Sequence, residues 1–320
     1  MDNSDLHKAR GAKSDEFYTS LDDIEKELAC YPVSAFAGKS VYCNCDDFSK
    51  SMFWRYFHMN FTRLGLRRLI ATCYGDTAYK AVYAGGVDDD ISDCDAAVMH
   101  GNGDFRSIEC ISILKSVDII VTNPPFSLFR EFVTLLMKHN KQFLILGNMN
   151  ALTYKEIFPY FRDNKMWYGA SIHSGDRKFI VPDDYELMAS GCGIDSAGHR
   201  FIRVKGVRWF TNLDYSTGIE KLVLDMHYNA DSYPVYDNYD AINVDKVCDI
   251  PCDYSGVMGV PITFMDKYNP AQFKILGMSA SWDESEAMRR IKTSERHRHG
   301  PIISGKEIYR RIFVKRLGVG

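Results

Sequence analysis

The sequence Asp-Ile-Ile-Val-Thr-Asn-Pro-Pro-Phe at residues 118–126 carries the clearest structural signal in the chain. Residues 118–122 form an apolar run bounded by polar residues, which is typical of a buried parallel strand. Two prolines then impose a rigid turn, and residues 127–138 repeat apolar side chains on one helical face. A strand, a tight turn and a helix in succession predict one unit of an α/β fold.

Segments on both sides continue this alternation. Ser51 is expected to cap a helix, because its hydroxyl can accept a backbone N–H, and residues 82–90 are expected to form a turn-rich excursion. The spacing of the segments predicts an α/β protein with a parallel sheet. The predicted strands are residues 40–45, 69–74 and 142–147, and the predicted helices are residues 22–28, 52–57 and 107–114.

The texture of the sequence changes after about residue 164, where Gly, Tyr, Asp and Asn become frequent and helical periodicity fades. We therefore expect a first domain at residues 1–164 and a loop-rich second region at residues 165–320, which also holds the remainder of the sheet. Within the second region, residues 178–181, 207–212 and 261–265 have the composition of β-strands.

The composition is that of a globular protein, with 46% hydrophobic and 25% charged residues among 320. The apolar runs are far shorter than the roughly 20 residues of a membrane helix, and no secretory signal is expected in the polar N-terminal segment. None of the nine cysteines pairs at C-x-x-C spacing, which favours reduced thiols over zinc or iron–sulfur ligation. These features predict a soluble cytoplasmic protein with no membrane segment and no metal site.

Charge is concentrated at the C-terminal end. Residues 288–320 hold ten Lys or Arg residues and two acidic residues, whereas the whole chain has a formal net charge of −3. A basic segment on an acidic body is typical of an element that contacts phosphates, although a solvated surface element would have the same composition.

The Asn-Pro-Pro-Phe turn combines hydrogen-bond acceptors with an aromatic ring. Asn123 offers a side-chain carbonyl and Pro124 a backbone carbonyl, while Pro125 fixes the turn and Phe126 adds a flat apolar face. Together they suit a planar group that carries an exocyclic NH₂. Hydrogen bonds from both N–H groups would draw the amine nitrogen toward tetrahedral geometry and free its lone pair to attack a methyl group held in line. An ordinary Asn-Pro-Pro loop turn is the alternative.

This motif after an apolar strand resembles that of S-adenosylmethionine-dependent methyltransferases that modify adenine N6 in DNA. The chain is most similar to the EcoRI-type adenine methyltransferases, over nearly its whole length. The resemblance implies a Rossmann-like class I methyltransferase sheet with a C-terminal, loop-rich target-recognition region. The matching stretches are KSDEFYT (13–19), VYCNCDD (41–47), GDFRS (103–107), VTNPPFSLFRE (121–131), TYKEIF (153–158), FIVPDDYEL (179–187), NYDAINV (238–244) and GVMGVPITF (256–264).

The resemblance also implies residue roles. Asn123, Pro124 and Phe126 would hold the target adenine, with Pro125 fixing the turn. S-adenosylmethionine would be bound by several short segments. The cofactor-binding residues would be Phe17, Tyr18 and Thr19 around the methionine portion, Asn44, Cys45, Asp46 and Ser51 at the end of the first strand, Asp104 and Phe105 at the cofactor adenine, and Asn123.

The first loop departs from the usual pattern, because residues 43–51 (CNCDDFSKS) contain no glycine. An acid directly after the second strand, where the ribose hydroxyls would bind, is also missing, although Asp76 is close. The cofactor positions are therefore expected on weaker grounds than the catalytic turn, and Asp46 and Asp104 could equally be turn or helix caps.

Methylation of adenine inside a duplex requires the base to leave the stack, which costs a few kcal/mol and must be offset by backbone contacts. The candidate DNA-binding residues are Arg289, Arg290, Asn238, Tyr239 and Lys267. Arg289 and Arg290 could read base edges, and contact with phosphates is the alternative.

These features predict a site-specific DNA methyltransferase of a restriction–modification system. Its partners would be double-stranded DNA, with a GAATTC-like target made plausible only by the resemblance, and a cognate restriction endonuclease. Two alternatives remain open at this point. Methylation of RNA adenine or a protein glutamine amide uses similar turns, and a DNA-binding module that has lost catalysis would keep the same overall pattern.

Overall fold

The computed structural model describes residues 19–85, 94–171, 176–181, 187, 191–196, 198–215, 220–293 and 300–318. The chain divides into two compact units. The first contains Met1–Ala151 and Met166–Thr217, and the second contains Leu152–Lys165 and Gly218–Gly320. The chain therefore leaves the first unit and returns to it before the second unit is built, and the expected boundary at residue 164 lies just before this return.

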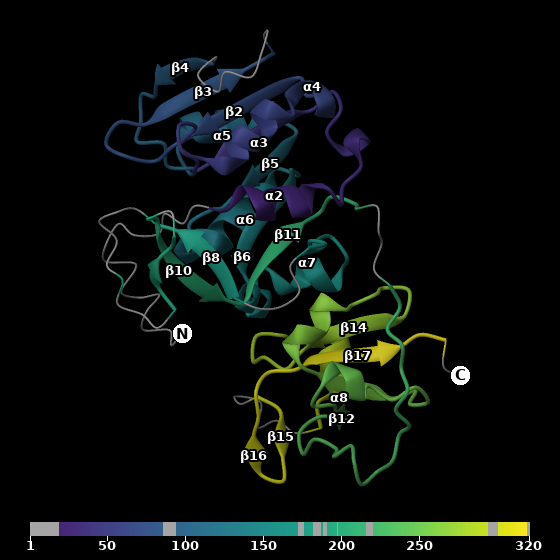
Figure 1. Ribbon diagram of the computed structural model, residues 1–320. Coiled ribbons are helices and arrows are strands. Elements are labelled where there is room, and N and C mark those ends of the chain that lie inside the picture. Colours follow the sequence, from purple (N-terminus) through teal and green to yellow (C-terminus); the bar gives the residue numbers. More distant parts are fainter. Residues whose placement is uncertain are drawn as a thin grey trace. The chain divides into compact units, whose positions relative to one another are not determined.

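The first unit is organised around an eight-stranded sheet (Figure 1) with the strand order β4-β3-β2-β1-β5-β6-β11-β7. Strands β2, β1, β5 and β6 are parallel, while β3, β4 and β11 run antiparallel to their neighbours. The bounds are β1 (Ser40–Asn44), β2 (Arg68–Thr72), β3 (Tyr79–Tyr83), β4 (Asp95–Val98), β5 (Ile119–Thr122), β6 (Gln142–Asn148), β7 (Trp167–Tyr168) and β11 (Val207–Thr211).

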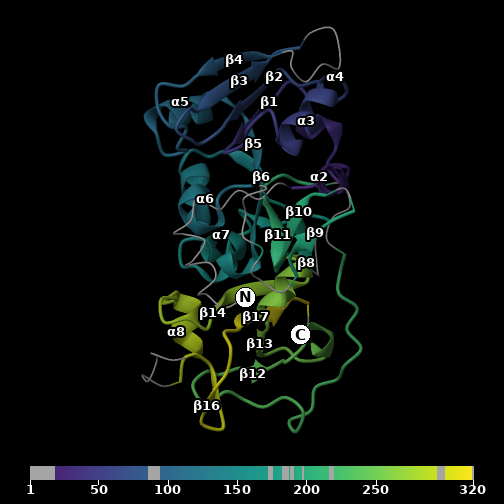
Figure 2. The ribbon, with the colours of Figure 1, turned by 60° about the vertical axis from the view of Figure 1, so that its left-hand side comes forward.

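Helices cover both faces of this sheet (Figure 2), with α5 and α6 on one side and α2, α3 and α4 on the other. The strands of the parallel core are buried on both faces, as expected for a sheet enclosed in this way. The bounds are α2 (Leu21–Leu28), η1 (Val33–Ala35), α3 (Met52–Met59), α4 (Phe61–Leu64), α5 (Ile108–Ser116), η2 (Phe126–Leu128), α6 (Phe129–Lys138) and η3 (Met149–Thr153).

A small antiparallel sheet with the order β8-β10-β9 belongs to the same unit. Its buried side chains, which include Phe179 and Ile202, share one apolar core with residues of α2, α3 and the large sheet. The strands are β8 (Asp176–Ile180), β9 (Gly193–Ile194) and β10 (Arg200–Lys205).

The second unit contains a four-stranded sheet of order β12-β13-β17-β14 and a hairpin of β15 and β16. Buried aromatic residues from the loop before β12 pack on Phe313 of β17. The bounds are α7 (Phe158–Arg162), β12 (Ile242–Asn243), η4 (Val247–Asp249), β13 (Val257–Val260), η5 (Ile262–Asp266), β14 (Phe273–Met278), α8 (Glu286–Ile291), β15 (Ile302–Ile303), β16 (Lys306–Glu307) and β17 (Ile312–Arg316).

The structure confirms the predicted strands and helices up to residue 148, and Ser51 does cap α3. The alternation is interrupted between β2 and α5, where β3 and β4 add two antiparallel strands to a sheet that was expected to be parallel. Two local predictions are wrong. The first two residues of the expected turn at 82–90 belong to strand β3, and residues 86–90 of that segment lie outside the described residues. The segment 261–265 is a 3₁₀ turn rather than a strand. Pro261, which lacks an N–H for a sheet ladder, instead accepts the first turn bond from Phe264 N at 2.9 Å.

Candidate active site

The carboxyl ends of β1 and β5 lie side by side at a reversal in strand order. Val41 pairs with Ile119 and Tyr42 with Ile120 in parallel, whereas β2 flanks the other side of β1. The chain after β1 therefore continues to one side of the sheet, and β5 is inserted on the other. In open α/β sheets a crevice forms outside such a reversal, at the carboxyl ends of the strands. This topology brings the loop between β1 and α3 (residues 45–51, the first-strand loop) next to the Asn-Pro-Pro-Phe turn.

Thr122 joins these two loops, and the sequence analysis did not single it out. The residue is fully buried at the end of β5. Its hydroxyl oxygen lies within hydrogen-bonding distance of the backbone carbonyl of Asn44 and 2.8 Å from Asp46 Oδ2. The catalytic turn and the first-strand loop are therefore held together one residue before Asn123.

The Asp46 carboxyl occupies an unusual environment for an acid. The pKa of this carboxyl is raised to about 7, mainly by desolvation in the surrounding protein and to a smaller extent by the charge of Asp47. Hydrogen bonds that Thr122 and Ser51 donate to the ionised carboxylate act in the opposite direction. Ser51 also accepts the N–H groups of Phe53 at 3.1 Å and Trp54 at 3.2 Å, so one hydroxyl caps helix α3 and holds Asp46.

Cys45 lies in the first-strand loop, which contains none of the glycines that methyltransferases usually have there. Its φ of 64° is in the left-handed region, which a residue with a Cβ rarely adopts. Burial raises the pKa of the Cys45 thiol well above its usual range, with Asp46 adding to the effect, so the thiol stays neutral. The loop thus makes its turn with a cysteine in place of glycine.

Asp104 and Phe105 lie on a loop that approaches the end of β2 closely. Gly103 has a φ of 73°, and a Cβ on it would lie 1.8 Å from the Cys73 carbonyl oxygen. Asp104 is held by Arg106, whose Nη2 lies 2.7 Å from Asp104 Oδ2, and these bonds lower the pKa of the carboxyl. Asp104 is therefore an ionised acceptor, which suits the position at the cofactor adenine that the resemblance implies.

Phe105 is buried, and its ring packs on Phe132 of α6 with the centroids 5.1 Å apart. The Arg106 guanidinium also lies 5.4 Å from the Phe105 ring centroid. The ring is therefore fixed in the core of the unit next to the loop that carries Asp104.

The Asn-Pro-Pro-Phe turn follows β5 and precedes α6, as predicted. Asn123 and Phe126 are half-buried, Pro124 is buried, and Pro125 begins the short helix η2. The Phe126 ring is nearly perpendicular to Phe179, with centroids 6.3 Å apart. Phe179 belongs to strand β8, more than fifty residues away along the chain, and supports a ring that still has an accessible surface.

Asn44 and Thr19, two of the predicted cofactor residues, each have a buried polar atom without a hydrogen-bond partner among the described residues. These atoms are the Asn44 side-chain nitrogen, which is a donor, and the Thr19 hydroxyl oxygen. The side-chain oxygen of Asn44, Oδ1, already accepts from Thr72 Oγ1 at 3.2 Å. The side-chain NH₂ group is therefore available to a bound acceptor. Of the other predicted cofactor residues, Phe17 and Tyr18 lie outside the described residues.

The predicted DNA-binding residues divide into two groups. Arg289 and Arg290 on α8 and Lys267 after η5 are exposed. Asn238 and Tyr239 are each 2% exposed. Asn238 bonds the backbone of residues 300 and 302, and the Tyr239 ring packs on a core phenylalanine. Their burial leaves no surface for a phosphate, so they are not among the DNA contacts proposed below.

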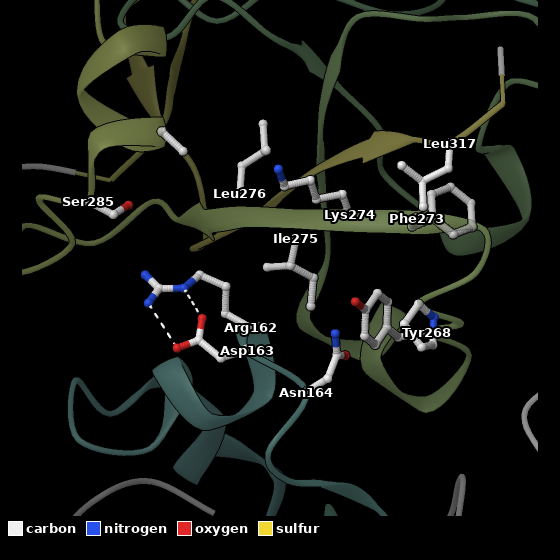
Figure 3. A pocket seen from close by; sticks show the side chains of 12 residues that line it. Arg162, Asp163, Asn164, Tyr268, Phe273, Lys274, Ile275, Leu276, Ser285 and Leu317 are labelled. Atoms are coloured by element: carbon white, nitrogen blue, oxygen red, sulfur yellow. Dashed lines mark hydrogen bonds and ion pairs between the residues drawn. The ribbon is translucent and has the colours of Figure 1, made fainter.

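The second unit contains a pocket of about 450 Å³ between the end of α7 and strand β14 (Figure 3). The Arg162 guanidinium in this pocket is paired with Asp163, whose Oδ1 lies 2.9 Å from Nε. Lys274 and Tyr268 also line it. None of the predicted catalytic or cofactor residues lies there, so this pocket is not the candidate active site.

Among the described residues, one group of side chains has the composition of a partial metal site: His227, Cys252 and Asp253. These side chains are largely exposed, and His227 Nδ1 already bonds Asp253 Oδ2 at 3.0 Å. Over the ranges that the structure describes, no helix has both the length and the apolar character that crossing a bilayer requires.

Comparison with known proteins gives a family match over nearly the whole chain. Residues 5–317 match the family described as adenine-specific methyltransferase EcoRI. The type II methyltransferase M.EcoRI of Escherichia coli is 46% identical, with 97% of this chain and 95% of that protein aligned. M.MpnI of Mycoplasma pneumoniae is 40% identical over 97% of each chain. M.MgeORF184P of Mycoplasma genitalium is 37% identical over 97% of this chain and 98% of its own.

No solved structure gave a significant match. The family match and the large mixed sheet together confirm the predicted Rossmann-like methyltransferase fold. The family match also excludes an unrelated fold that shares only the Asn-Pro-Pro-Phe turn, because the aligned residues cover both units. The chain belongs to the EcoRI family of adenine-specific methyltransferases.

Proposed function

We propose that the protein transfers a methyl group from S-adenosylmethionine to N6 of an adenine that has left the stack of duplex DNA, at a specific sequence. The observation that carries the proposal is the position of the Asn-Pro-Pro-Phe turn beside the first-strand loop. Both lie at the carboxyl ends of β1 and β5, where the strand order of the sheet reverses. Asn123 and the Pro124 carbonyl accept the two amine hydrogens, and Phe126 stacks on the base.

The polar groups of the first unit suit this cofactor. The free NH₂ of Asn44 is a donor for a carboxylate or a ring nitrogen. Asp104 is an ionised acceptor, and Asp46 becomes one when it loses its proton, so that each can then face a cationic or N–H group. When bound, S-adenosylmethionine supplies the electrophilic methyl group. The chain's own residues hold the amine lone pair in line with it and exclude water, so no strong base is needed.

The second unit supplies the proposed contacts to the DNA backbone. Arg289, Arg290 and Lys267 are exposed cations, and the segment from residue 288 onward is the most basic part of the chain. We further propose a cognate restriction endonuclease with the same recognition site, and a cytoplasmic location. The nine free thiols and a DNA substrate both suit a reducing compartment.

Replacement of Asn123 by Ala tests the proposed reaction. The variant loses one of two acceptors aimed at the amine, so transfer should fall by about 10² or more, while cofactor binding stays close to that of the wild type. The measurements are incorporation of labelled methyl into duplex oligonucleotides and calorimetric titration with S-adenosylmethionine. Near-normal transfer by this variant would contradict the assigned role.

The same assay distinguishes the alternatives. Label recovered as N6-methyladenine in duplex DNA supports the proposal. Label recovered in RNA or in protein would assign the second substrate class. Binding of DNA without any transfer would assign a DNA-binding module that has lost catalysis. The intact turn and the family's adenine specificity favour the first outcome.

A further inference from the structure

The hydroxyl of Thr122 has two acceptors and one hydrogen. Its oxygen lies within hydrogen-bonding distance of the Asn44 carbonyl, which has no hydrogen to give, and 2.8 Å from Asp46 Oδ2. A hydroxyl donates once and can accept twice. One hydrogen can be shared between two acceptors only as a bent, weaker three-centre bond. Two linear hydrogen bonds form when Thr122 donates to the Asn44 backbone carbonyl and Asp46 donates to Thr122, which requires a protonated Asp46.

The other contacts of Asp46 do not remove this requirement. Ser51 accepts two backbone N–H groups at the start of α3, so its own hydrogen is directed to Asp46. That bond satisfies one lone pair of the carboxyl and leaves the contact with Thr122 unchanged. The Asp46 backbone N–H is also engaged, because it donates to the Thr72 carbonyl at 2.9 Å.

The charged and titratable groups that face Asp46 favour the same state. Asp47, in the same loop, adds a negative charge and raises the pKa of Asp46. The Cys43 and Cys45 thiols on and after β1 are neutral, because burial raises the pKa of both well above the usual range. Lys50, in the same loop, has its ammonium group 3.8 Å from Asp47 Oδ2, and the interactions that shift the pKa of Asp46 come from burial, Thr122, Ser51 and Asp47. Burial of the carboxyl is the largest cause, and the resulting pKa is about 7.

We propose that Asp46 holds a proton in the cofactor-free protein and releases it when the cationic cofactor binds, with Thr122 as the positioning residue that passes this change to the catalytic turn. This inference rests on the proposed function, since it assumes that the loop after β1 binds S-adenosylmethionine. The step balances simply: the carboxylic acid loses H⁺ to solvent, and the carboxylate remains beside the positive charge of the ligand.

Release of the proton turns the Thr122 hydroxyl. An ionised Asp46 can only accept, so Thr122 then donates to Asp46 and its bond to the Asn44 carbonyl is lost. Thr122 immediately precedes Asn123. The state of the first-strand loop therefore changes the bonding of the residue that enters the Asn-Pro-Pro-Phe turn, which places cofactor binding before adenine capture.

Calorimetric titration of the full-length protein with S-adenosylmethionine, in buffers of different ionisation enthalpy, measures the protons released. The wild type should release nearly one proton at about pH 6 and about half of one near pH 7, with a decline above that. Asp46→Asn should abolish this contribution. The difference between the two proteins cancels the titration of the cofactor's own amino group.

Substitutions of Thr122 identify the positioning role. Thr122→Val removes a donor that lowers the pKa of Asp46, so proton release should persist to higher pH, and Thr122→Ser should restore the wild-type profile. Thr211→Val is the matched control. It removes another buried strand hydroxyl, which donates to the Phe143 carbonyl at 2.8 Å, and should leave the profile unchanged.

A measurement on the wild type alone makes the result independent of how well the variants fold. The infrared difference spectrum on cofactor binding should lose the C=O band of a protonated carboxyl. Equal proton release by the wild type and Asp46→Asn, or an unchanged infrared band, would overturn this inference and leave the proposed function standing. Failure of the wild type to bind the cofactor at all would overturn both.

Discussion

At the residue scale, Gly103 sets how closely the loop carrying Asp104 approaches strand β2. Gly103 and Gly38 have nearly the same φ, 73° and 72°, but a Cβ on Gly103 would lie 1.8 Å from the Cys73 carbonyl oxygen, and one on Gly38 would meet nothing within 4 Å. Alanine at either position should cost about 1–2 kcal/mol for the left-handed backbone.

Gly103→Ala should cost a further 1–3 kcal/mol or so, because the loop must move away from β2. It should also weaken cofactor binding, whereas Gly38→Ala should not. Urea unfolding and calorimetric titration of both variants measure these effects. Equal losses of stability for the two variants would show that the loop yields to the added methyl group without strain.

The raised pKa of Asp46 makes the stability of the cofactor-free protein depend on pH. The folded pKa of about 7 exceeds the ordinary value of 3.8. The contribution of this carboxyl to the free energy of unfolding is therefore fully present below about pH 4. It is lost as the pH rises from about 4 to about 7.

Asp46→Asn does not titrate, so its stability relative to the wild type should increase with pH by up to about 1.4 kcal/mol per pH unit in this window. Urea unfolding of both proteins at several values between pH 4 and pH 8 gives the difference, in which all other groups cancel. A constant difference would mean that Asp46 is ionised in the folded protein throughout this range.

Thr122 shows where sequence reasoning at the residue scale ends. The motif after it could be interpreted because its chemistry is local: two prolines, an amide and a ring in consecutive positions. Thr122 owes its importance to Asn44 and Asp46, more than seventy residues earlier in the chain. Only the pairing of β1 with β5 brings them together, and nothing in the sequence states which strands are neighbours.

At the element scale, three helices of the first unit begin with a serine whose side chain accepts a backbone N–H. Ser20 caps α2, Ser51 caps α3 and Ser107 caps α5. Loss of such a cap costs about 1 kcal/mol. Ser51 differs from the others because it also hydrogen-bonds Asp46 and lowers the pKa of that carboxyl.

Ser51→Ala and Ser107→Ala should therefore destabilise the protein by similar amounts, near 1 kcal/mol. Only Ser51→Ala should move the pH dependence of stability to higher pH, because the pKa of Asp46 rises further when a donor is removed. Unfolding curves across pH for both variants test this. Identical pH profiles would show that the hydroxyl of Ser51 acts on the helix alone.

Elements were predictable where one period of hydrophobicity was sustained. The run before Asn123 was predicted because it is a continuous apolar segment, buried on both faces of the sheet. The helix after it was predicted because its apolar side chains recur on one face. The segment 261–265 was not, because five residues with two β-branched side chains fit a strand and a 3₁₀ turn equally well. Tertiary packing of Phe264 and Met265 decides between them.

At the scale of the whole molecule, the division of the chain could not be predicted from composition. The change in texture near residue 164 is real, but Trp167–Tyr168 and Val207–Thr211 return to complete the first sheet as β7 and β11. The short segment Leu152–Lys165 belongs instead to the second unit. Such an excursion leaves no signature, because both units use the same kinds of apolar residues.

The uneven charge along the chain leads to a prediction about DNA binding as a whole. Arg289 and Arg290 belong to the basic segment, and their side chains are 69% and 75% exposed beside Glu284 and Glu286. Exposed ion pairs of this kind are worth little, so both arginines remain available to phosphates. The double substitution of both by Gln should weaken binding to all duplexes and reduce the salt dependence of log K by up to about 2.

Lys26→Gln, which removes an exposed cation on α2, is the control and should leave this slope unchanged. The measurement is DNA affinity at several salt concentrations, for duplexes with and without the methylated sequence. A loss confined to the methylated sequence, with the slope unchanged, would instead assign the two arginines to base edges. Phosphate contact is the expected result, because the exposed ion pairs with Glu284 and Glu286 hold these guanidinium groups too weakly to fix them in the bidentate geometry of base reading.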